Sequence, residues 1–526
     1  MTGNSDKYGS ARWCDSKELA AEGIATGRTL KDLAGSFLLG ETADTRELLK
    51  GIRKEDPDYL RPIFATSRLA GGSYLGWKGG GHILTVAPTR SGKGVGMVIP
   101  NLLHYSGSVL VVDPKGENYA VTQRHRKDNL GQDIVCLDPF GAVSSSCDSI
   151  NPFDILVANY SAGPANYLKH NPELLDDASM IADALVVREA DEHEPHWNDK
   201  CRTLLKGLIL AVACGHGPKK HRHLSEVRSL LTSGQSAFIK LLADMRKDTA
   251  AIGGHLSRAS NEIQSMGTEE LKNVVSYALK HTEFLDSPLV DACLGDEYRT
   301  HQHGSYDLMD LKKFGKVSIY MILPPRHLAR YNRLLRLWMT MALAAMTKTK
   351  DKPKNGSVLF MLDEMAQLGT LDILRQSVSL LAGYGMTLWM IWQDISQIKA
   401  LYERDWTSFI ANAKIQQYFG VNDHETAKMV SEMIGDETLT VSTMSTGSNR
   451  GGLAIDFTGL TSSTSRNQSE SLSEKDRALL APDEMRRLNR EAVIMFVQGL
   501  PPVAARRLTY HTNSELNLFA DKNPYL

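Results

Sequence analysis

The stretch Ile83-Leu-Thr-Val-Ala-Pro-Thr-Arg-Ser-Gly-Lys93-Gly94 decides the fold class of this 526-residue chain. A short apolar run leads directly into a loop ending in Gly-Lys, close to the pattern Gly-x-x-x-x-Gly-Lys-[Ser/Thr]. In such a loop consecutive backbone N–H groups wrap phosphate groups at the start of a helix, and the lysine adds a cation. Ala87 replaces the first glycine of the pattern, and Gly94 replaces the residue whose hydroxyl normally binds Mg²⁺. We predict a phosphate-binding loop; the alternative is a chance turn before a helix. The predicted loop comprises Ala87, Pro88, Thr89, Arg90, Ser91, Gly92, Lys93, Gly94 and Val95.

A second apolar run, Val358-Leu-Phe-Met-Leu, ends in two carboxylates, Asp363 and Glu364. At a strand tip, Asp363 can hold Mg²⁺ through water and Glu364 can polarise an attacking water. Because Gly94 has no hydroxyl, Mg²⁺ would depend on phosphate oxygens, waters and Asp363. Gln393 ends a further apolar run and fits a residue that senses the γ-phosphate or the water, with a plain surface amide as the alternative. The sequence thus predicts an ATP site that uses Mg²⁺, with a catalytic set of Lys93, Asp363, Glu364 and Gln393.

The two motifs are separated by 270 residues, from Lys93 to Asp363. Strand-like apolar runs occur early in this gap, as in Val109-Leu-Val-Val-Asp113 and Ile134-Val-Cys-Leu-Asp138, and resume at Val317. Between about 156 and 305 helical spacing dominates, and a βαβ unit needs about 30 residues or more. An inserted helical domain is therefore simpler than a long series of βαβ units. Two apolar helical stripes support it: Trp197, Cys201, Leu204, Leu205 and Leu208, and Phe238, Leu241, Leu242 and Met245.

These patterns predict an α/β fold with an all-α insertion. The expected division is a loosely packed lead-in at 1–60, a nucleotide-binding domain in two parts at 61–155 and 306–526, and an all-α inserted domain at 156–305. Residues 441–475 are rich in Ser, Thr, Asn and Gly and are expected to form a mobile loop or a hairpin tip.

Composition excludes several classes of protein. The net charge of −1 excludes a basic coat for nucleic acid, so any grip on a phosphate backbone must be local. Six cysteines without a CxxC spacing indicate reduced thiols rather than a disulfide framework. No signal peptide is visible, and the best membrane candidate, 337–346, has about half of the ~20 apolar residues that a spanning helix needs. We expect a soluble chain in which this segment is a buried helix.

Two weaker clusters are also present. His193 and His196 could bind a metal, although two histidines in an acidic loop are more typical of a solvated segment. Four arginines precede the apolar segment 337–346 and could face nucleic acid or a neighbour's phosphate, with a solvated helix face as the favoured alternative: Arg326, Arg330, Arg333 and Arg336.

Over most of its length the chain resembles the type IV secretion coupling proteins of the TraG type. The resemblance is carried, in order, by Tyr8-Gly-Ser-Ala-Arg-Trp13, Ala87-Pro-Thr-Arg-Ser-Gly-Lys-Gly-Val-Gly with Ile99-Pro100, Asp113-Pro-Lys-Gly-Glu117, Asn151-Pro-Phe153, Leu362-Asp-Glu-Met-Ala-Gln-Leu-Gly369, and Gly383-Tyr-Gly before Gln393. Members of this family often carry glycine after the loop lysine, so Gly94 looks like a family trait.

The resemblance implies a RecA-like nucleotide-binding domain interrupted by an all-α domain that recognises cargo. It also implies a homo-hexamer with ATP sites at subunit boundaries, at the cytoplasmic face of the bacterial inner membrane. Implied partners are a relaxase bound to single-stranded DNA or an effector protein, together with the secretion channel ATPases and inner-membrane components. Relatives usually begin with transmembrane helices, which are not found here, so we expect a soluble truncation or a form docking on a membrane partner, with a monomer as the alternative state. Arg375 is the candidate for an arginine acting on a neighbour's site.

Three functional hypotheses remain from the sequence. The first is an ATP-hydrolysing motor that delivers DNA or protein cargo to the channel. The second is a docking receptor whose helical insert is switched by nucleotide with little turnover. The third, a ring translocase on double-stranded DNA, is disfavoured by the insert and by the Asp113-Pro-Lys-Gly-Glu117 segment.

Overall fold

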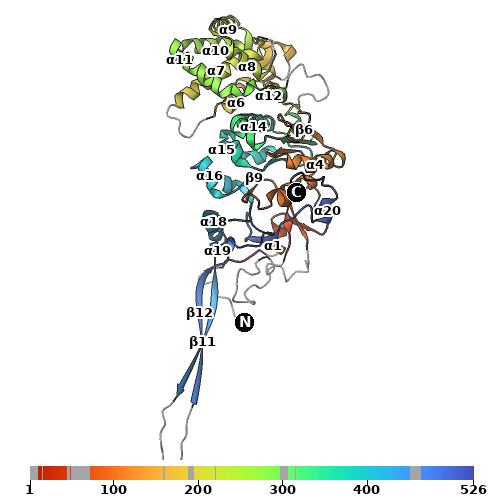
Figure 1. Ribbon diagram of the computed structural model, residues 1–526, viewed down its shortest axis with the longest axis vertical. Helices are drawn as coiled ribbons and strands as arrows, with labels where there is room; N and C mark the ends of the chain where they lie inside the picture. The colour runs from red at the N-terminus through yellow and green to blue at the C-terminus, as the bar shows by residue number, and fades with distance from the viewer. Residues whose placement is uncertain are drawn as a thin grey trace, which may run out of the picture.

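The computed structural model describes residues 10–14, 16–43, 48, 72–157, 160–187, 195–218, 221–295, 306–313, 315–450 and 464–526. Residues 8 and 9 of the first motif, His193 and the centre of the 441–475 segment lie outside these ranges. Figure 1 shows a large sheet in the middle of the molecule, a helical unit at one end and a long hairpin at the other. The sheet therefore separates the two features that the sequence places between its strands.

Twelve described strands form one sheet in the order β1-β3-β2-β14-β13-β10-β4-β9-β8-β5-β7-β6. From β10 to β6 all neighbours are parallel, and from β10 to β1 all are antiparallel. The strands are β1 (Ile24–Gly27), β2 (Phe37–Glu41), β3 (Tyr74–Trp77), β4 (His82–Val86), β5 (Val109–Val112), β6 (Asp133–Leu137), β7 (Val317–Met321), β8 (Val358–Leu362), β9 (Met386–Trp392), β10 (Ala413–Tyr418), β13 (Ala492–Val497) and β14 (Val503–Arg506).

The parallel strands are the continuous apolar runs of the sequence. Every residue of β4, β5, β7, β8 and β9 is buried. A parallel sheet is covered on both faces, which is why its strands lose the alternation of polar and apolar residues. The predicted strands at these positions are confirmed.

Between β6 and β7 all regular elements of the described residues are helical. In α7 (Pro195–Ala213) the predicted stripe is fully buried at Cys201, Leu204, Leu205 and Leu208 and partly buried at Trp197. In α9 (Gln235–Lys247) Leu241, Leu242 and Met245 are at most 7% exposed, and Phe238 is partly buried. The α/β fold with an all-α insertion is confirmed. Its main helices are α5 (Tyr167–His170), α6 (Leu174–Leu185), α7 (Pro195–Ala213), α8 (Leu224–Thr232), α9 (Gln235–Lys247), α10 (His255–Ser265), α11 (Thr268–Thr282) and α12 (Pro288–Cys293).

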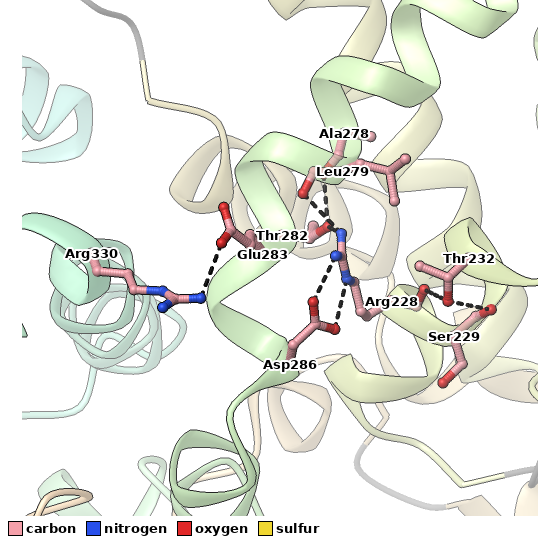
Figure 2. Close-up of polar contacts among 9 residues, drawn as sticks. All are labelled: Arg228, Ser229, Thr232, Ala278, Leu279, Thr282, Glu283, Asp286 and Arg330. Atoms are coloured by element: carbon pink, nitrogen blue, oxygen red, sulfur yellow. Dashed lines mark hydrogen bonds and ion pairs between the residues drawn. The ribbon is translucent and has the colours of Figure 1, made fainter.

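Arg228 of α8 joins this helix to the end of α11 (Figure 2). Its guanidinium donates two hydrogen bonds to the Asp286 carboxylate, at 2.9 and 2.7 Å, and one to the Leu279 carbonyl at 2.8 Å. Nearby, Arg330 of α14 (Pro325–Thr347) pairs with Glu283 at 3.0 Å. The Arg228 side chain is only 14% exposed, although its partner Asp286 is 52% exposed, while Arg330 and Glu283 are both about 60% exposed. Arg228 therefore holds the helical unit together, and the Arg330 pair, which joins the unit to α14, contributes little.

Two expectations differ from the structure. Residues 16–43 are not loosely packed, because β1 and β2 extend the sheet and Phe37, Leu38 and Leu39 are at most 3% exposed. Cys147 and Cys293 form a disulfide with their Cα atoms 6.1 Å apart, while the remaining cysteines are free: Cys14, Cys136, Cys201 and Cys214. Sequence spacing could not show that two cysteines 146 positions apart lie within bridging distance.

Two antiparallel strands account for most of the Ser- and Thr-rich segment. β11 (Asp436–Arg450) pairs with β12 (Thr464–Ala478) without a register shift, which confirms the hairpin alternative. Fifteen-residue strands extend about 50 Å, and Figure 1 shows the hairpin pointing away from the sheet. The apolar segment 337–346 is buried in α14, as predicted. In the described part of the chain no helix has the length and apolar character to cross a membrane.

Candidate nucleotide-binding site

Four neighbouring parallel strands, β4, β9, β8 and β5, end at one edge of the sheet. Directly after them come Ala87, Gln393, Asp363 and Asp113, respectively. Ligands of open α/β sheets bind outside the carboxyl ends of such strands. Strand order, rather than sequence proximity, brings the two predicted motifs together and places Gln393 between them.

The predicted phosphate loop lies between β4 and the helical turn that follows it in the sequence. Arg90 adopts a left-handed conformation with φ of 63°, as does Gly92 with φ of 86°. For a residue other than glycine this conformation costs about 1–2 kcal/mol, and such strain is typical of ligand clamps. The chain continues in a π-helical turn, η2 (Gly94–Val98), and in α3 (Ile99–His104). Pro100 has no N–H to donate in this first turn, which fits the wider turn before it.

Lys93, Gln393 and Glu364 meet at a single carboxylate oxygen. Glu364 Oε2 lies 3.1 Å from Lys93 Nζ and accepts a hydrogen bond of 3.1 Å from Gln393 Nε2. The lysine and glutamate side chains are only 16% and 14% exposed. Gln393 is itself held through its backbone N–H, which donates to Gln397 Oε1 at 3.0 Å. Lys93 and Glu364, 271 positions apart, and Gln393, a further 29 positions along the chain, therefore form one hydrogen-bonded group.

A second group of carboxylates lies beside the first. Asn118 Nδ2 lies 3.4 Å from Asp113 Oδ1 and 3.5 Å from Asp363 Oδ2, and the Tyr119 N–H donates to Asp113 at 2.8 Å. Burial raises the pKa of Asp113 to about 7; the Tyr119 N–H opposes this rise and the charge of Asp363 adds to it. Burial also raises the pKa of Asp363, with the Lys93 ammonium opposing and Glu364 adding. Acidic groups are thus gathered here, and burial favours their protonated forms until a cation binds.

Several buried polar atoms of the site have no hydrogen-bond partner: Ser91 Oγ, Asp363 Oδ1 and Glu364 Oε1. Buried polar atoms are nearly always paired, so unpaired ones mark a place for a ligand. Among the residues that the structure describes, no three His, Cys, Asp or Glu side chains form a closed metal cage. Mg²⁺ needs none, since it binds one or two carboxylates together with phosphate oxygens and waters. The oxygen donors present fit such an ion, with Asp363 as the predicted protein ligand.

Sequence reasoning missed the residues that the C-terminal segment brings to the loop. Arg507 Nη1 donates to the Ser91 carbonyl at 2.9 Å, and its guanidinium stacks 4.5 Å above the ring of Phe419. A Cβ on Gly92 would lie 3.0 Å from the same nitrogen, so Arg507 packs directly against the loop. Tyr510 donates its backbone N–H to the Val95 carbonyl at 3.1 Å. No sequence motif marks these residues. The one local feature that could have drawn attention to them is the pair of arginines at 506 and 507, where β14 ends.

The other candidates lie elsewhere. The four arginines of α14 do not form one face, because Arg336 is buried and donates to the Leu368 and Thr370 carbonyls at 3.0 and 2.6 Å. The helix passes from surface to core along its length, which changes the environment of successive arginines. Arg375, in α15 (Asp372–Leu381), lies 3.7 Å from Asp405 and is 43% exposed. His196 is exposed and packs beside Trp197.

Comparisons with known proteins show to which family the chain belongs. Residues 41–524 match the family described as type IV secretory system conjugative DNA transfer. The chain is 28% identical to the conjugal transfer protein TraG of Escherichia coli over 97% of this chain and 78% of that protein. It is 24% identical to the protein VirD4 of Rhizobium radiobacter over 85% of this chain and 59% of that one.

Solved structures show the same fold. The unbound bacterial conjugative coupling protein TrwB superposes with a TM-score of 0.58 at 14% identity, covering 90% of this chain and 94% of that one. TrwB in complex with ADP and Mg²⁺ gives a TM-score of 0.56 at 14% identity, covering 90% and 95%. With the match over nearly the whole sequence, the RecA-like fold with its all-α insertion and the loop at the strand tips identify the chain as a member of the type IV secretory system conjugative DNA transfer family, the type IV coupling proteins.

Proposed function

We propose that this chain is an ATP-hydrolysing coupling protein that delivers a relaxase bound to single-stranded DNA, or an effector protein, to a type IV secretion channel. The observation that carries the proposal is the convergence of Lys93 and Gln393 on one carboxylate oxygen of Glu364, next to Asp363. The names of the relatives, conjugal transfer and coupling proteins, supply the cargo class and the channel. Nucleotide-bound structures of TrwB support ATP and Mg²⁺ as ligands.

The same contacts suggest how the residues act. Lys93 is paired with Glu364 without nucleotide and would exchange this carboxylate for phosphate oxygens when ATP binds. Gln393 would then keep Glu364 in place through its 3.1 Å hydrogen bond. Glu364 Oε1, buried and unpartnered, is the atom suited to accept a proton from the attacking water. Asp363 would hold Mg²⁺, which supplies positive charge to the phosphate oxygens.

Assembly and location complete the proposal. A homo-hexamer with ATP sites at subunit boundaries, at the cytoplasmic face of the inner membrane, fits the family. In such a ring an arginine from the neighbouring subunit would act on the phosphates, and Arg375 remains the candidate because it is exposed on a helix that follows the Asp363-Glu364 strand.

Two variants test the chemistry. Lys93→Ala should weaken ATP binding and abolish turnover, because the loop loses its cation. Glu364→Gln should keep ATP binding and lose turnover by at least about 100-fold, because an amide cannot accept the proton. Steady-state phosphate release and equilibrium binding of a fluorescent ATP analogue separate the two effects. A wild-type chain that binds ATP with negligible turnover, matched by Glu364→Gln, would contradict the motor and favour the nucleotide-switched docking receptor.

A further inference from the structure

Gly94 supplies no side-chain hydroxyl to the phosphate loop. In the usual pattern a serine or threonine stands here and its hydroxyl binds Mg²⁺. A Cβ built on Gly94 would have one heavy-atom neighbour within 4 Å, the Glu117 Oε2 oxygen at 3.9 Å. Glu117 is the first residue of α4 (Glu117–Asp128) and follows Gly116, whose φ of 72° turns the chain into the helix. A carboxylate from another strand end therefore lies next to the position of the missing hydroxyl.

The C-terminal segment holds this carboxylate. Asn523, 6% exposed, donates from Nδ2 to Glu117 Oε1 at 2.7 Å, and the same amide nitrogen lies 3.2 Å from the Tyr510 hydroxyl. Tyr510 in turn donates its backbone N–H to Val95 of the loop at 3.1 Å. Glu117 Oε1 is thus occupied by Asn523, while Oε2 is the oxygen that lies beside Gly94.

A second observation indicates that a cation belongs at this place. Asp363 Oδ1 is buried and has no hydrogen-bond partner. Hard oxygen donors of this kind, one or two from the protein with the remainder from phosphate and water, are what Mg²⁺ binds.

We propose that Glu117 supplies an oxygen ligand to the Mg²⁺ of the bound nucleotide in place of the hydroxyl that Gly94 lacks, directly or through one water, and that Asn523 is its positioning residue. The inference rests on the proposed nucleotide site and adds a second protein ligand to Asp363. It also gives a function to the contacts of Tyr510 with the loop and of Asn523 with Glu117, because these contacts hold a metal ligand in position. If Glu117 only complemented the helix dipole of α4, its removal would leave metal binding unchanged.

The chain offers its own compensating change. Gly94→Ser restores the usual hydroxyl, and the Cβ has room because its nearest neighbour is at ordinary contact distance. Binding of the fluorescent analogue mant-ADP would be titrated with Mg²⁺ and with EDTA for the wild type, Glu117→Gln, Gly94→Ser and the double variant. Binding in EDTA, equal in all four, verifies that each loop is folded.

We expect Glu117→Gln to reduce the Mg²⁺-dependent gain in mant-ADP affinity by at least about tenfold, and the double variant to recover most of it. Asn523→Ala should reduce the gain less, and should have no effect when Gly94→Ser is present, which a merely structural role would not show. If Glu117→Gln keeps the full Mg²⁺-dependent gain in mant-ADP affinity, the inference is overturned. It is also overturned if the double variant is as impaired as Glu117→Gln alone. Either result leaves the proposed nucleotide site intact. A wild type whose affinity for mant-ADP ignores Mg²⁺ overturns the site itself and the inference with it.

Discussion

Asp113 is an acid that the fold keeps away from water. It is 1% exposed, and burial raises its pKa from the ordinary 3.8 to about 7. Between these two values the folded chain binds the proton and the unfolded chain does not, so the carboxyl's contribution to the free energy of unfolding falls as the pH rises through this window. The upper bound of the effect is about 4 kcal/mol.

Asp113→Asn removes this titration, because an amide stays neutral. The melting temperature of the variant relative to the wild type should therefore rise from pH 4 to pH 7 and stay level above pH 8. Thermal unfolding of the nucleotide-free chain at pH 5, 6, 7 and 8 measures this difference. An offset that is the same at every pH would show that Asp113 does not titrate in this range.

A site residue could be predicted from the sequence when a local pattern places it in the site, and not when a distant segment does. Lys93, Asp363, Glu364 and Gln393 were visible because each ends an apolar run or a phosphate-loop pattern, and the structure brings them to one place. Asn523 was not, because its role depends on Glu117, which lies 406 positions away and is reached only by the folded C-terminal segment. Side chains that act by supporting another side chain carry no local signal.

At the scale of elements, a substitution of Arg228 tests how much this residue contributes to the packing of the helical unit. Its guanidinium serves Asp286, Leu279 and Thr282, and it is 14% exposed (Figure 2). Arg228→Met should lower the free energy of unfolding by about 1–3 kcal/mol, since it removes a charged donor from the part-buried Leu279 carbonyl and Thr282 hydroxyl of α11 and from the Asp286 carboxylate. Urea unfolding followed by circular dichroism gives the value.

Arg330→Met is the matched control, because it removes an arginine that contacts the same helical unit from α14, through an ion pair that is about 60% exposed. Exposed pairs contribute between 0 and about 1 kcal/mol, so this variant should stay within about 0.5 kcal/mol of the wild type. Equal losses for the two variants would contradict the account of the junction.

Elements were predictable where burial is complete and unpredictable where pairing is long-range. Strands such as β8 and β9 are buried along their whole length and therefore appear in the sequence as unbroken apolar runs. The antiparallel strands β1 and β2 were missed because β1 has only four residues and β2 contains Gly40. Their place in the sheet depends on β14, which lies more than 450 positions later. The hairpin of β11 and β12 was foreseen only as one of two alternatives, since Ser and Thr suit both loops and strands.

At the scale of the whole molecule, the sheet carries the nucleotide site and stands between the helical unit and the hairpin (Figure 1). As the motor proposed above, the chain would have to pass changes at the strand tips to cargo held elsewhere. Its overall charge of −1 requires that any contact with DNA be confined to a local surface. Binding to single-stranded DNA should then weaken as salt rises, because neutralised phosphates release counterions. Fluorescence anisotropy of a labelled oligonucleotide at 50 to 200 mM salt tests this, and salt-independent binding would contradict it.

The measurement that tests the central claim most directly is ATP turnover of the purified chain with and without single-stranded DNA, beside Lys93→Ala, with molecular mass read by light scattering in the same samples. The account predicts turnover that rises with DNA, that the variant loses, and that accompanies a hexamer. A chain that binds ATP in either state of assembly yet hydrolyses it no faster with DNA than without would contradict it.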